Sequence, residues 1–266
     1  MVECFYNFHL EIDMQIHYIE EIKKSIEEAN LVLVGLGEEW NVSPDTQSSQ
    51  VYQTVMSDLK AHPEYQWLLP YFYYKWTDDK LQQAYKNLFD LLKDKNYFVV
   101  ATTTNRGFVP FVREGRFVMP CGTEEHMCNE DLSKSIEYAG FTDSLEAYIK
   151  GDISFEEIQF VKNEAGEVIP FNNIFAQGYK EEGYLPQWSK YMSWLQGTMN
   201  RKVCLLELGA GLQFPSVIRF PFEKMAYFNQ KATCFRVHRA LYQLTEEMAE
   251  RSVSVPMHAV ELFEDK

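Results

Sequence analysis

A run of hydroxyl and amide side chains stands at the end of one apolar stretch near the middle of the chain. Residues 97–105 read YFVVATTTN, in which a predicted buried strand leads into Thr103, Thr104 and Asn105. Short polar side chains at the carboxyl end of a strand are placed to bind a ligand, although threonine and asparagine also begin turns for purely local reasons. We predict that these three side chains contribute to a ligand site.

Glycines take the same position after two other apolar stretches. Residues 31–37 read LVLVGLG and residues 203–211 read VCLLELGAG, so each predicted strand ends in a glycine turn. Glycine lets the chain turn sharply, and it lets a ligand approach backbone N–H groups where no Cβ intervenes. Because the carboxyl ends of parallel strands share one edge of a sheet, we expect the turns to line one crevice, where open α/β folds bind nucleotides.

Helices with apolar side chains at helical spacing alternate with these strands. The expected helices cover residues 12–29, 81–92, 187–197 and 216–229, and a last long helix begins at Leu241. Pro221 should kink or break the fourth of them, and a further strand is expected at 233–237. The alternation predicts an α/β fold with a doubly wound, Rossmann-like parallel sheet and a small inserted domain.

The alternation divides the chain into two parts. Residues 1–105 and 186–266 are expected to form the Rossmann-like domain, with an aromatic-rich helical excursion at 38–78. Residues 106–185, where the alternation fails, are expected to form the small inserted domain or a lid. Aromatic side chains of the excursion are more often core than pocket lining, and we expect them to be core.

Composition limits the classes of partner. The chain has 266 residues, of which 46% are hydrophobic, and a formal net charge of −14. That charge opposes binding to nucleic acid or anionic lipid, because such surfaces attract positive charge. No apolar run reaches the length of a membrane span and the sequence starts without a signal-like stretch, so we expect a cytoplasmic protein.

The five cysteines are widely spaced and include no CxxC pair. Cys121 and Cys128 could supply two metal ligands, but no second pair completes a tetrahedral site. Scattered thiols of this kind are expected to be reduced and mostly structural. No metal is therefore expected.

An acid followed by Gly-x-Gly, as in Glu207 to Gly211, is also how methyltransferases that use S-adenosylmethionine open their cofactor loop. Too little of the chain follows Gly211 to complete the sheet of such an enzyme. The next predicted strand ends in Val237 and His238 rather than in an acid for a ribose hydroxyl. The methyltransferase remains a minor alternative.

The arrangement as a whole resembles the sirtuin family of NAD-dependent enzymes, over roughly the full length of the chain. The first glycine turn is similar to the family's Gly-Ala-Gly loop at the NAD pyrophosphate, and residues 103–105 to its Thr-Gln-Asn stretch at the nicotinamide ribose. The second glycine turn is similar to its Gly-Thr-Ser beside the adenosine ribose, and residues 237–238 to its adenine-side loop. The resemblance implies that NAD or ADP-ribose is bound by Gly35, Leu36, Gly37, Thr103, Thr104, Asn105, Gly209, Ala210, Gly211, Val237 and His238.

Residues 181–224, EEGYLPQWSKYMSWLQGTMNRKVCLLELGAGLQFPSVIRFPFEK, are the most specific part of the resemblance. They look most like a divergent microbial branch of sirtuins sometimes linked to macrodomains, in which the known activity is ADP-ribosyl transfer to a protein rather than deacylation. The resemblance therefore implies cleavage of the nicotinamide–ribose bond, with Asn105 positioning ribose or water and a protein as the partner.

The sequence departs from the family at the catalytic base. Cys121 and Gly122 stand where sirtuins need a His-Gly pair to take a proton from the ribose. A thiol with an ordinary pKa of about 8.5 is a poor base at neutral pH. His126 is close in sequence and could substitute, although histidine in an acidic loop is more often a surface residue. The catalytic candidates are Asn105 and His126.

The sequence also departs in charge. Glu38 and Glu39 follow the first glycine turn, where the family has a Ser-Gly-Ile-Pro-x-Phe-Arg passage that closes over NAD, and the zinc cysteines of the family are missing. A carboxylate about 4 Å from a phosphate costs about 4 kcal/mol at an effective dielectric near 20, unless its side chain points to solvent. Arg106 is expected to pair with one of these glutamates, and Arg219 either pairs with Glu207 or meets a phosphate.

Two functions follow. One is a sirtuin-like enzyme that cleaves NAD to transfer ADP-ribose to a protein or to deacylate it. The other is a catalytically inactive homologue that binds a nucleotide or a partner protein through the same crevice. Release of nicotinamide from NAD would separate the two.

Overall fold

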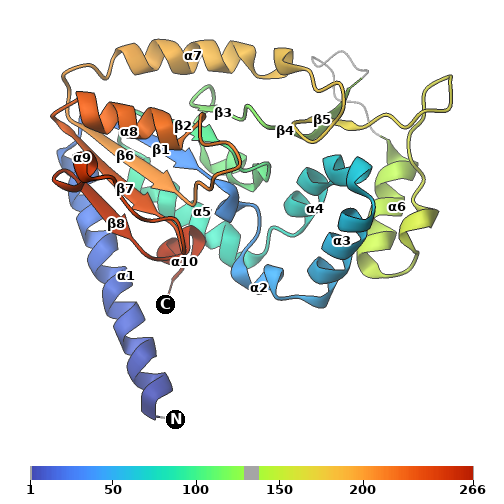
Figure 1. Cartoon of the computed structure of the whole chain (residues 1–266), viewed down its shortest axis with the longest axis horizontal. Coiled ribbons are helices and arrows are strands. Elements are labelled where there is room, and N and C mark those ends of the chain that lie inside the picture. The colour runs from blue at the N-terminus through green and yellow to red at the C-terminus, as the bar shows by residue number, and fades with distance from the viewer. Residues whose placement is uncertain (1, 129–137, 266) are drawn as a thin grey trace.

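The computed structural model describes residues 2–128 and 138–265. Its main element is a six-stranded sheet with strand order β3-β2-β1-β6-β7-β8, and every neighbouring pair in it is parallel. The strands are β1 Leu31–Leu36, β2 Tyr97–Ala101, β3 Phe117–Val118, β6 Val203–Leu208, β7 Ala232–Val237 and β8 Ser252–Val255. The predicted parallel α/β sheet is confirmed (Figure 1).

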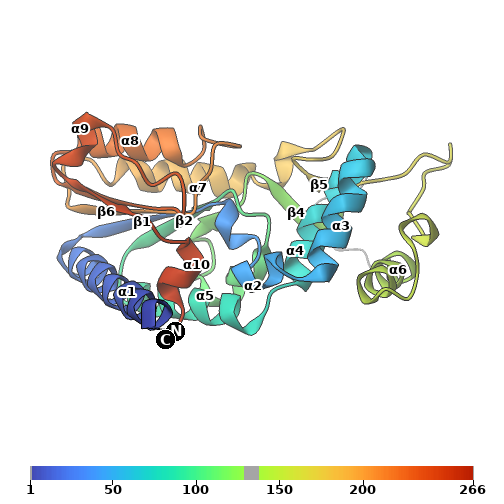
Figure 2. The same ribbon diagram turned by 60° about the horizontal axis from the view of Figure 1, so that its bottom comes forward.

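Helices cover both faces of the sheet (Figure 2). One face carries α1 Val2–Glu28, α5 Asp79–Leu92 and α10 Ala259–Phe263, and the other carries α7 Leu185–Gln196 and α8 Arg219–Phe228. Alternate residues of β1 belong to different cores: Val32 packs with the first set of helices and Leu33 with the second. Strands covered on both faces are apolar without interruption, and for this reason β1 reads as a continuous apolar run.

The strands end level with one another. Leu36 of β1 lies opposite Ala101 of β2 and Leu208 of β6, and Leu208 lies opposite Val237 of β7. Val237 in turn lies opposite Val255 of β8. The turns that follow five strands therefore start from a single row at the carboxyl edge of the sheet.

A second, aromatic core lies beside this edge. It joins helices α3 Gln50–Ala61, α4 Leu69–Lys75 and α6 Ala139–Lys150 to the antiparallel pair of β4 Gly122–Met127 and β5 Phe171–Asn173, and the short helix α2 Pro44–Gln47 precedes α3. Trp67, Tyr71 and Phe72 are buried in it, as expected of aromatic side chains that form core. Residues from 38–78 and from 106–185 share this core, and the domain boundaries drawn from sequence stay a prediction.

Short 3-10 segments complete the connections. They are η1 Glu38–Trp40, η2 Pro63–Leu68, η3 Arg106–Phe111, η4 Phe155–Glu157 and η5 Glu181–Gly183. An antiparallel bridge joins Lys162 to Val168. Within the described part of the chain, none of the helices is both long and apolar enough to cross a membrane.

Two expectations for the C-terminal part were wrong. The helix expected from 216 begins at Arg219, so Pro221 lies in its first turn, where a missing N–H is tolerated. The long helix expected from Leu241 is replaced by the short α9 Glu246–Ala249 followed by β8. The chain remains irregular after β7 because the Nδ1 atom of His238 accepts hydrogen bonds from the N–H groups of Ala240 and Leu241, both at 3.0 Å.

Candidate functional site

Hydrogen bonds tie the turns at the carboxyl edge to one another. The N–H groups of Thr102 and Thr103 donate to the carbonyl of Leu36 at 2.8 and 3.1 Å. The N–H of Gly37 donates to the carbonyl of Leu208 at 2.8 Å, and the N–H of Gly209 donates to that of Val237 at 2.7 Å. The segments that the sequence singled out therefore do lie together, and their binding of a ligand stays a prediction.

Gly35 lies inside β1 rather than in the turn, and close packing of a helix explains why a glycine is needed at this position. A Cβ at this position would lie 2.5 Å from Cγ2 of Ile218 and 3.0 Å from Cζ of Phe222, both on or next to α8. The neighbouring Leu36 is fully buried in the core on the opposite face of the sheet. These two residues hold the turn in place from within the core and do not face a crevice.

The two glycine turns touch through their backbones. A Cβ on Gly37 would lie 2.2 Å from the carbonyl oxygen of Gly209 and 2.3 Å from the N atom of Ala210. Gly209 itself has a φ of 66°, which favours glycine. The glycines therefore allow one loop to pack directly on the other, and the space between them is filled by protein.

Asn105 is fully buried, and its amide is saturated with hydrogen bonds. Its Nδ2 donates to the carbonyls of Tyr73 at 2.8 Å and Asn41 at 2.9 Å, and its Oδ1 accepts from the N–H of Gly107 at 2.8 Å. In this geometry the amide fastens α4 and the segment after β1 to the end of β2. A ligand would have to displace one of these partners to reach it.

Asn41, which sequence reasoning missed, organises the hydroxyl run. Its Oδ1 accepts from Oγ1 of Thr103 at 2.9 Å and from the N–H of Thr104 at 3.0 Å. The Oγ1 atoms of Thr102 and Thr104 are buried without a hydrogen-bond partner. These two hydroxyls are the feature of the edge that best fits a bound ligand, because buried polar atoms normally have partners.

Glu38 and Glu39 occupy the backbone donors that the crevice offers. Glu38 Oε2 accepts from the N–H of Gly211 at 2.6 Å, directly after β6. Glu39 Oε1 accepts from the N–H of Arg239 at 3.0 Å, after β7, and Oε2 accepts from that of Ala259 at 2.8 Å, after β8. Backbone N–H groups at strand ends are what hold a phosphate in open α/β folds. In this structure two carboxylates of the chain itself hold them.

Burial sets the protonation of this cluster. It raises the pKa of Glu39 from 4.5 to about 7, although the N–H groups of Arg239 and Ala259 oppose the rise. His238 lies 3.3 Å from Glu39, between its Nδ1 and Oε1, and burial lowers the pKa of His238 to about 4. His238 is therefore neutral at pH 7, and its Nδ1 is an acceptor that faces the acceptor oxygen Oε1 of Glu39. Protonation of Glu39 removes this repulsion between two acceptors.

The acid of the second glycine turn has a structural partner. Glu207 is fully buried and makes two hydrogen bonds with Arg236, from Nε to Oε1 and from Nη2 to Oε2, both at 2.9 Å. Arg219 adds an ion pair from Nη2 to Oε1 of Glu207 at 3.3 Å, which is the first of the two roles considered for it. A carboxylate bound in this way is not free to meet a cofactor ribose, and this removes the main support for the methyltransferase.

The two candidate bases differ in exposure. Cys121 is buried, and burial together with the charge of Glu38 raises the pKa of its thiol to about 12, so it is unsuited to take a proton at neutral pH. His126 lies in β4 and lines two clefts beside the small sheet. Neither lining includes Asn105, so the structure does not bring the two catalytic candidates together in one cleft.

Arg106 does not pair with Glu38 or Glu39, and that expectation was wrong. Its Nε donates to Oε1 of Glu124, and its Nη1 lies 3.6 Å from Oε1 of Glu125. The start of η3 turns the side chain away from the glycine turns and towards the small sheet. No group of three or more His, Cys, Asp or Glu side chains suited to a metal occurs among residues 2–128 and 138–265.

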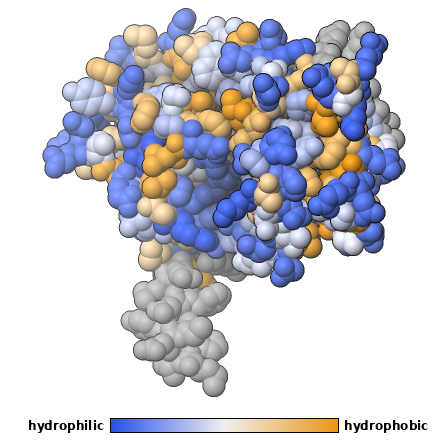
Figure 3. Space-filling view, turned by 45° about the vertical axis from the view of Figure 1, so that its right-hand side comes forward, coloured by the Kyte–Doolittle hydropathy of each residue, from blue (hydrophilic) through white to orange (hydrophobic). Residues whose placement is uncertain are grey.

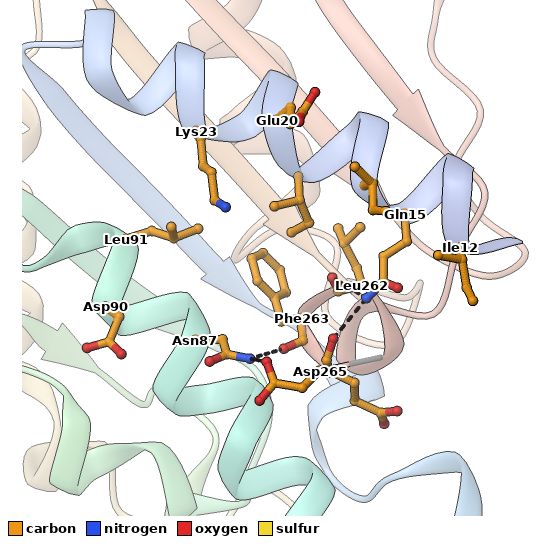
Figure 4. A pocket seen from close by; sticks show the side chains of 13 residues that line it. Ile12, Gln15, Glu20, Lys23, Asn87, Asp90, Leu91, Leu262, Phe263 and Asp265 are labelled. Carbon is orange, nitrogen blue, oxygen red and sulfur yellow. Dashed lines mark hydrogen bonds between the residues drawn. The ribbon is translucent and has the colours of Figure 1, made fainter.

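A separate cleft of about 430 Å³ lies between α1 and α5 (Figure 4). The C-terminal segment closes its floor: Asn87 Nδ2 donates to the carbonyl of Phe263 at 2.8 Å, and Gln15 Nε2 donates to the carbonyl of Leu262 at 3.1 Å. Leu262 and Phe263 are buried there, so the C-terminal segment is docked on the helices. The C-terminal segment therefore packs at the base of this cleft, which is separate from the crevice at the glycine turns.

Comparisons with known proteins agree with the resemblance seen in the sequence. No family model matches the chain. The chain is 20% identical to a curated Staphylococcus aureus protein named "Protein ADP-ribosyltransferase", over 92% of this chain and 85% of that one. At this identity, neither the name nor the activity of that protein carries over to this chain.

Solved structures with a similar course of the chain bear the Sir2 name. One, described as "Structural Basis for the Mechanism and Regulation of Sir2 Enzymes", is 11% identical, with a TM-score of 0.49 and coverage of 92% of this chain and 94% of that one. Another, a complex of a mutant Sir2 homologue with ADP-ribose, is 12% identical, with a TM-score of 0.45 and coverage of 92% and 93%. At this level of similarity, no property of the site is inferred from these structures. The properties of the site follow from the contacts within this chain.

Proposed function

We propose that this chain is a sirtuin-like protein that does not cleave NAD and acts as a protein-binding module. The observation that carries the proposal is the pair of carboxylates at the crevice: Glu38 and Glu39 accept the N–H groups of Gly211, Arg239 and Ala259. A pyrophosphate that approached these donors would meet the carboxylate of Glu38 and the side chain of Glu39, whose pKa is raised to about 7. At about 4 Å and an effective dielectric near 20, one such contact costs about 4 kcal/mol, which is close to a thousandfold in affinity.

The fit of the residues to NAD is poor for a second reason. Gly37 packs on the backbone of Gly209 and Ala210, so the loops leave no space for a phosphate between them. Asn105 already has carbonyl partners for its amide, and the buried thiol of Cys121 has a pKa raised to about 12. Positioning of the ribose and removal of its proton are the two tasks that cleavage needs. Neither residue is available for its task in this arrangement.

A second candidate is transfer of ADP-ribose from NAD to a protein, or deacylation of a protein, with Asn105 and His126 as catalytic residues. The name of the Staphylococcus aureus relative favours it, and so do the unpartnered buried hydroxyls of Thr102 and Thr104. It requires Glu38 and Glu39 to leave their N–H partners before a dinucleotide enters. When bound, NAD would supply the reactive bond between nicotinamide and ribose.

Nicotinamide release separates the two candidates. The parent chain and the variant Asn105→Asp are purified and incubated separately with NAD at pH 7.5. The melting temperature of the variant checks that it is folded. We expect no nicotinamide above the level of buffer from either protein. Release by the parent chain that the variant abolishes would contradict the proposal and support the transferase.

A further inference from the structure

One of the two clefts that His126 lines, here called the Glu124 cleft, is formed by residues of α4, β4 and α6. Figure 1 shows these elements on the side of the molecule that carries the small sheet. The volume of the Glu124 cleft is about 390 Å³. Aromatic side chains and charged side chains both line it. The charged residues are Lys75, Arg106, Glu124, Glu125, Asp143 and Glu146. Figure 3 shows a hollow on one face of the molecule that is surrounded mostly by hydrophilic residues.

Carboxylates outnumber cations in the Glu124 cleft. Lys75 pairs with Glu146, and Arg106 pairs with Glu124 and lies near Glu125, so among residues 2–128 and 138–265 neither cation pairs with Asp143. Burial raises the pKa of the Tyr71 hydroxyl in the cleft wall, and the charges of Glu146, Glu124 and Asp143 raise it further. The field inside the cleft is therefore negative and favours a cation.

One carboxylate oxygen in the wall has no donor. Glu124 is 8% exposed; its Oε1 accepts from Arg106, while its Oε2 is buried and has no hydrogen-bond partner among the residues that the structure describes. Buried carboxylate oxygens normally accept hydrogen bonds, and an N–H donor from a ligand would supply the missing one. The unpaired oxygen of Glu124 therefore favours a ligand that carries hydrogen-bond donors as well as positive charge.

The aromatic walls suit a flat cation. The guanidinium of Arg106 lies over the ring of Tyr74, with 4.0 Å from Cζ to the ring centroid. Tyr71 and Phe171 stand nearly parallel, at 10° and 6.0 Å between centroids. Guanidinium groups stack on aromatic faces and donate to carboxylates at the same time, which an ammonium does less well. The cleft already holds one guanidinium of the chain in this manner.

We propose that the Glu124 cleft binds an arginine side chain of a partner protein. The inference rests on the proposed function, because it names the chemistry by which a protein-binding module would recognise its partner. The guanidinium of the partner pairs with Asp143 and donates to Glu124, beside the aromatic side chains of the wall. A basic partner also suits the whole chain, whose formal net charge is −14.

The test is a titration of the full chain with two short peptides, followed by NMR shifts of backbone amides. The first is acetyl-Gly-Arg-Gly-amide, and the second carries citrulline, a neutral residue of the same shape, in place of arginine. We expect the arginine peptide to shift amides of β4 and α6 and to bind about tenfold more tightly than the citrulline peptide. Equal affinity of the two peptides, or no shift at 10 mM of either, would overturn the proposal.

Two variants localise the effect. Asp143→Asn removes an exposed carboxylate of the cleft that makes no ion pair, and we expect it to weaken the arginine peptide about threefold. Glu164→Gln removes an exposed carboxylate outside the cleft and should leave the affinity unchanged. Equal losses in both variants would show attraction by net charge alone and would overturn the site. Peptide binding by a chain that also released nicotinamide would contradict the proposed function while leaving the cleft assignment standing.

Discussion

Replacing Glu39 by glutamine should change how the stability of the chain depends on pH. Burial raises the pKa of Glu39 from 4.5 to about 7, so between these values the folded chain holds a proton that the unfolded chain has released. The stability linked to this group is therefore fully present below pH 4.5 and is lost as the pH rises through 7. At 1.36 kcal/mol per pKa unit, the loss amounts to about 3 kcal/mol.

Urea unfolding, followed by tryptophan fluorescence between pH 4.5 and 8.5, measures the effect. Glu39→Gln keeps the shape of the side chain and cannot ionise, so its free energy of unfolding should gain about 3 kcal/mol relative to the parent between pH 4.5 and 8. The charged or titratable groups that face Glu39 are Arg239, Glu261 and His238, and all three are present in both proteins. The exposed Glu250→Gln serves as the control and should follow the parent. A difference between Glu39→Gln and the parent that stays constant with pH would refute the burial of this carboxyl.

The remaining predictions concern packing and binding at other places. Arg236→Ala leaves Glu207 buried with one of its two arginine partners, and urea unfolding should show a loss of about 3–5 kcal/mol; a loss under 1 kcal/mol would contradict the buried pair. Gly37→Ala forces a Cβ against the carbonyl of Gly209 and should cost about 1–3 kcal/mol, whereas Gly140→Ala, with its nearest neighbouring atom at 3.7 Å, should be neutral or stabilising. Equal effects of the two glycine variants would contradict the loop contact. The arginine peptide should bind more weakly as salt rises, since its guanidinium meets partly exposed carboxylates; salt-independent binding would contradict an electrostatic site.

The sheet could be predicted from the sequence because its central strands are covered on both faces. β1 and β2 are apolar throughout and β6 is apolar except for Glu207; all three lead into glycine or short polar residues, and this pattern has few other interpretations. The meeting of their turns followed from parallel strand direction alone. β8 could not be predicted in the same way: Ser252–Val255 is short, half-buried and at the edge of the sheet, so its pattern is weak.

Side-chain direction was the part that the sequence did not determine. Glu38 and Glu39 could equally point to solvent, and only the positions of Gly211 and Ala259 in the folded chain make them acceptors at the crevice. From the sequence, Arg106 could pair with Glu38 or Glu39 or with an acid that follows it. In the structure, Arg106 begins η3 and pairs with Glu124. The Glu-Glu pair directly after the first glycine turn was the available signal, and its physical meaning depended on tertiary contacts.

A crystal structure grown with ADP-ribose at pH 8 tests the central claim most directly. The account predicts that Glu38 Oε2 remains on the N–H of Gly211 and that Glu39 remains on those of Arg239 and Ala259, with no pyrophosphate at these donors. An ADP-ribose pyrophosphate bound to these N–H groups, with both glutamates turned away, would contradict it.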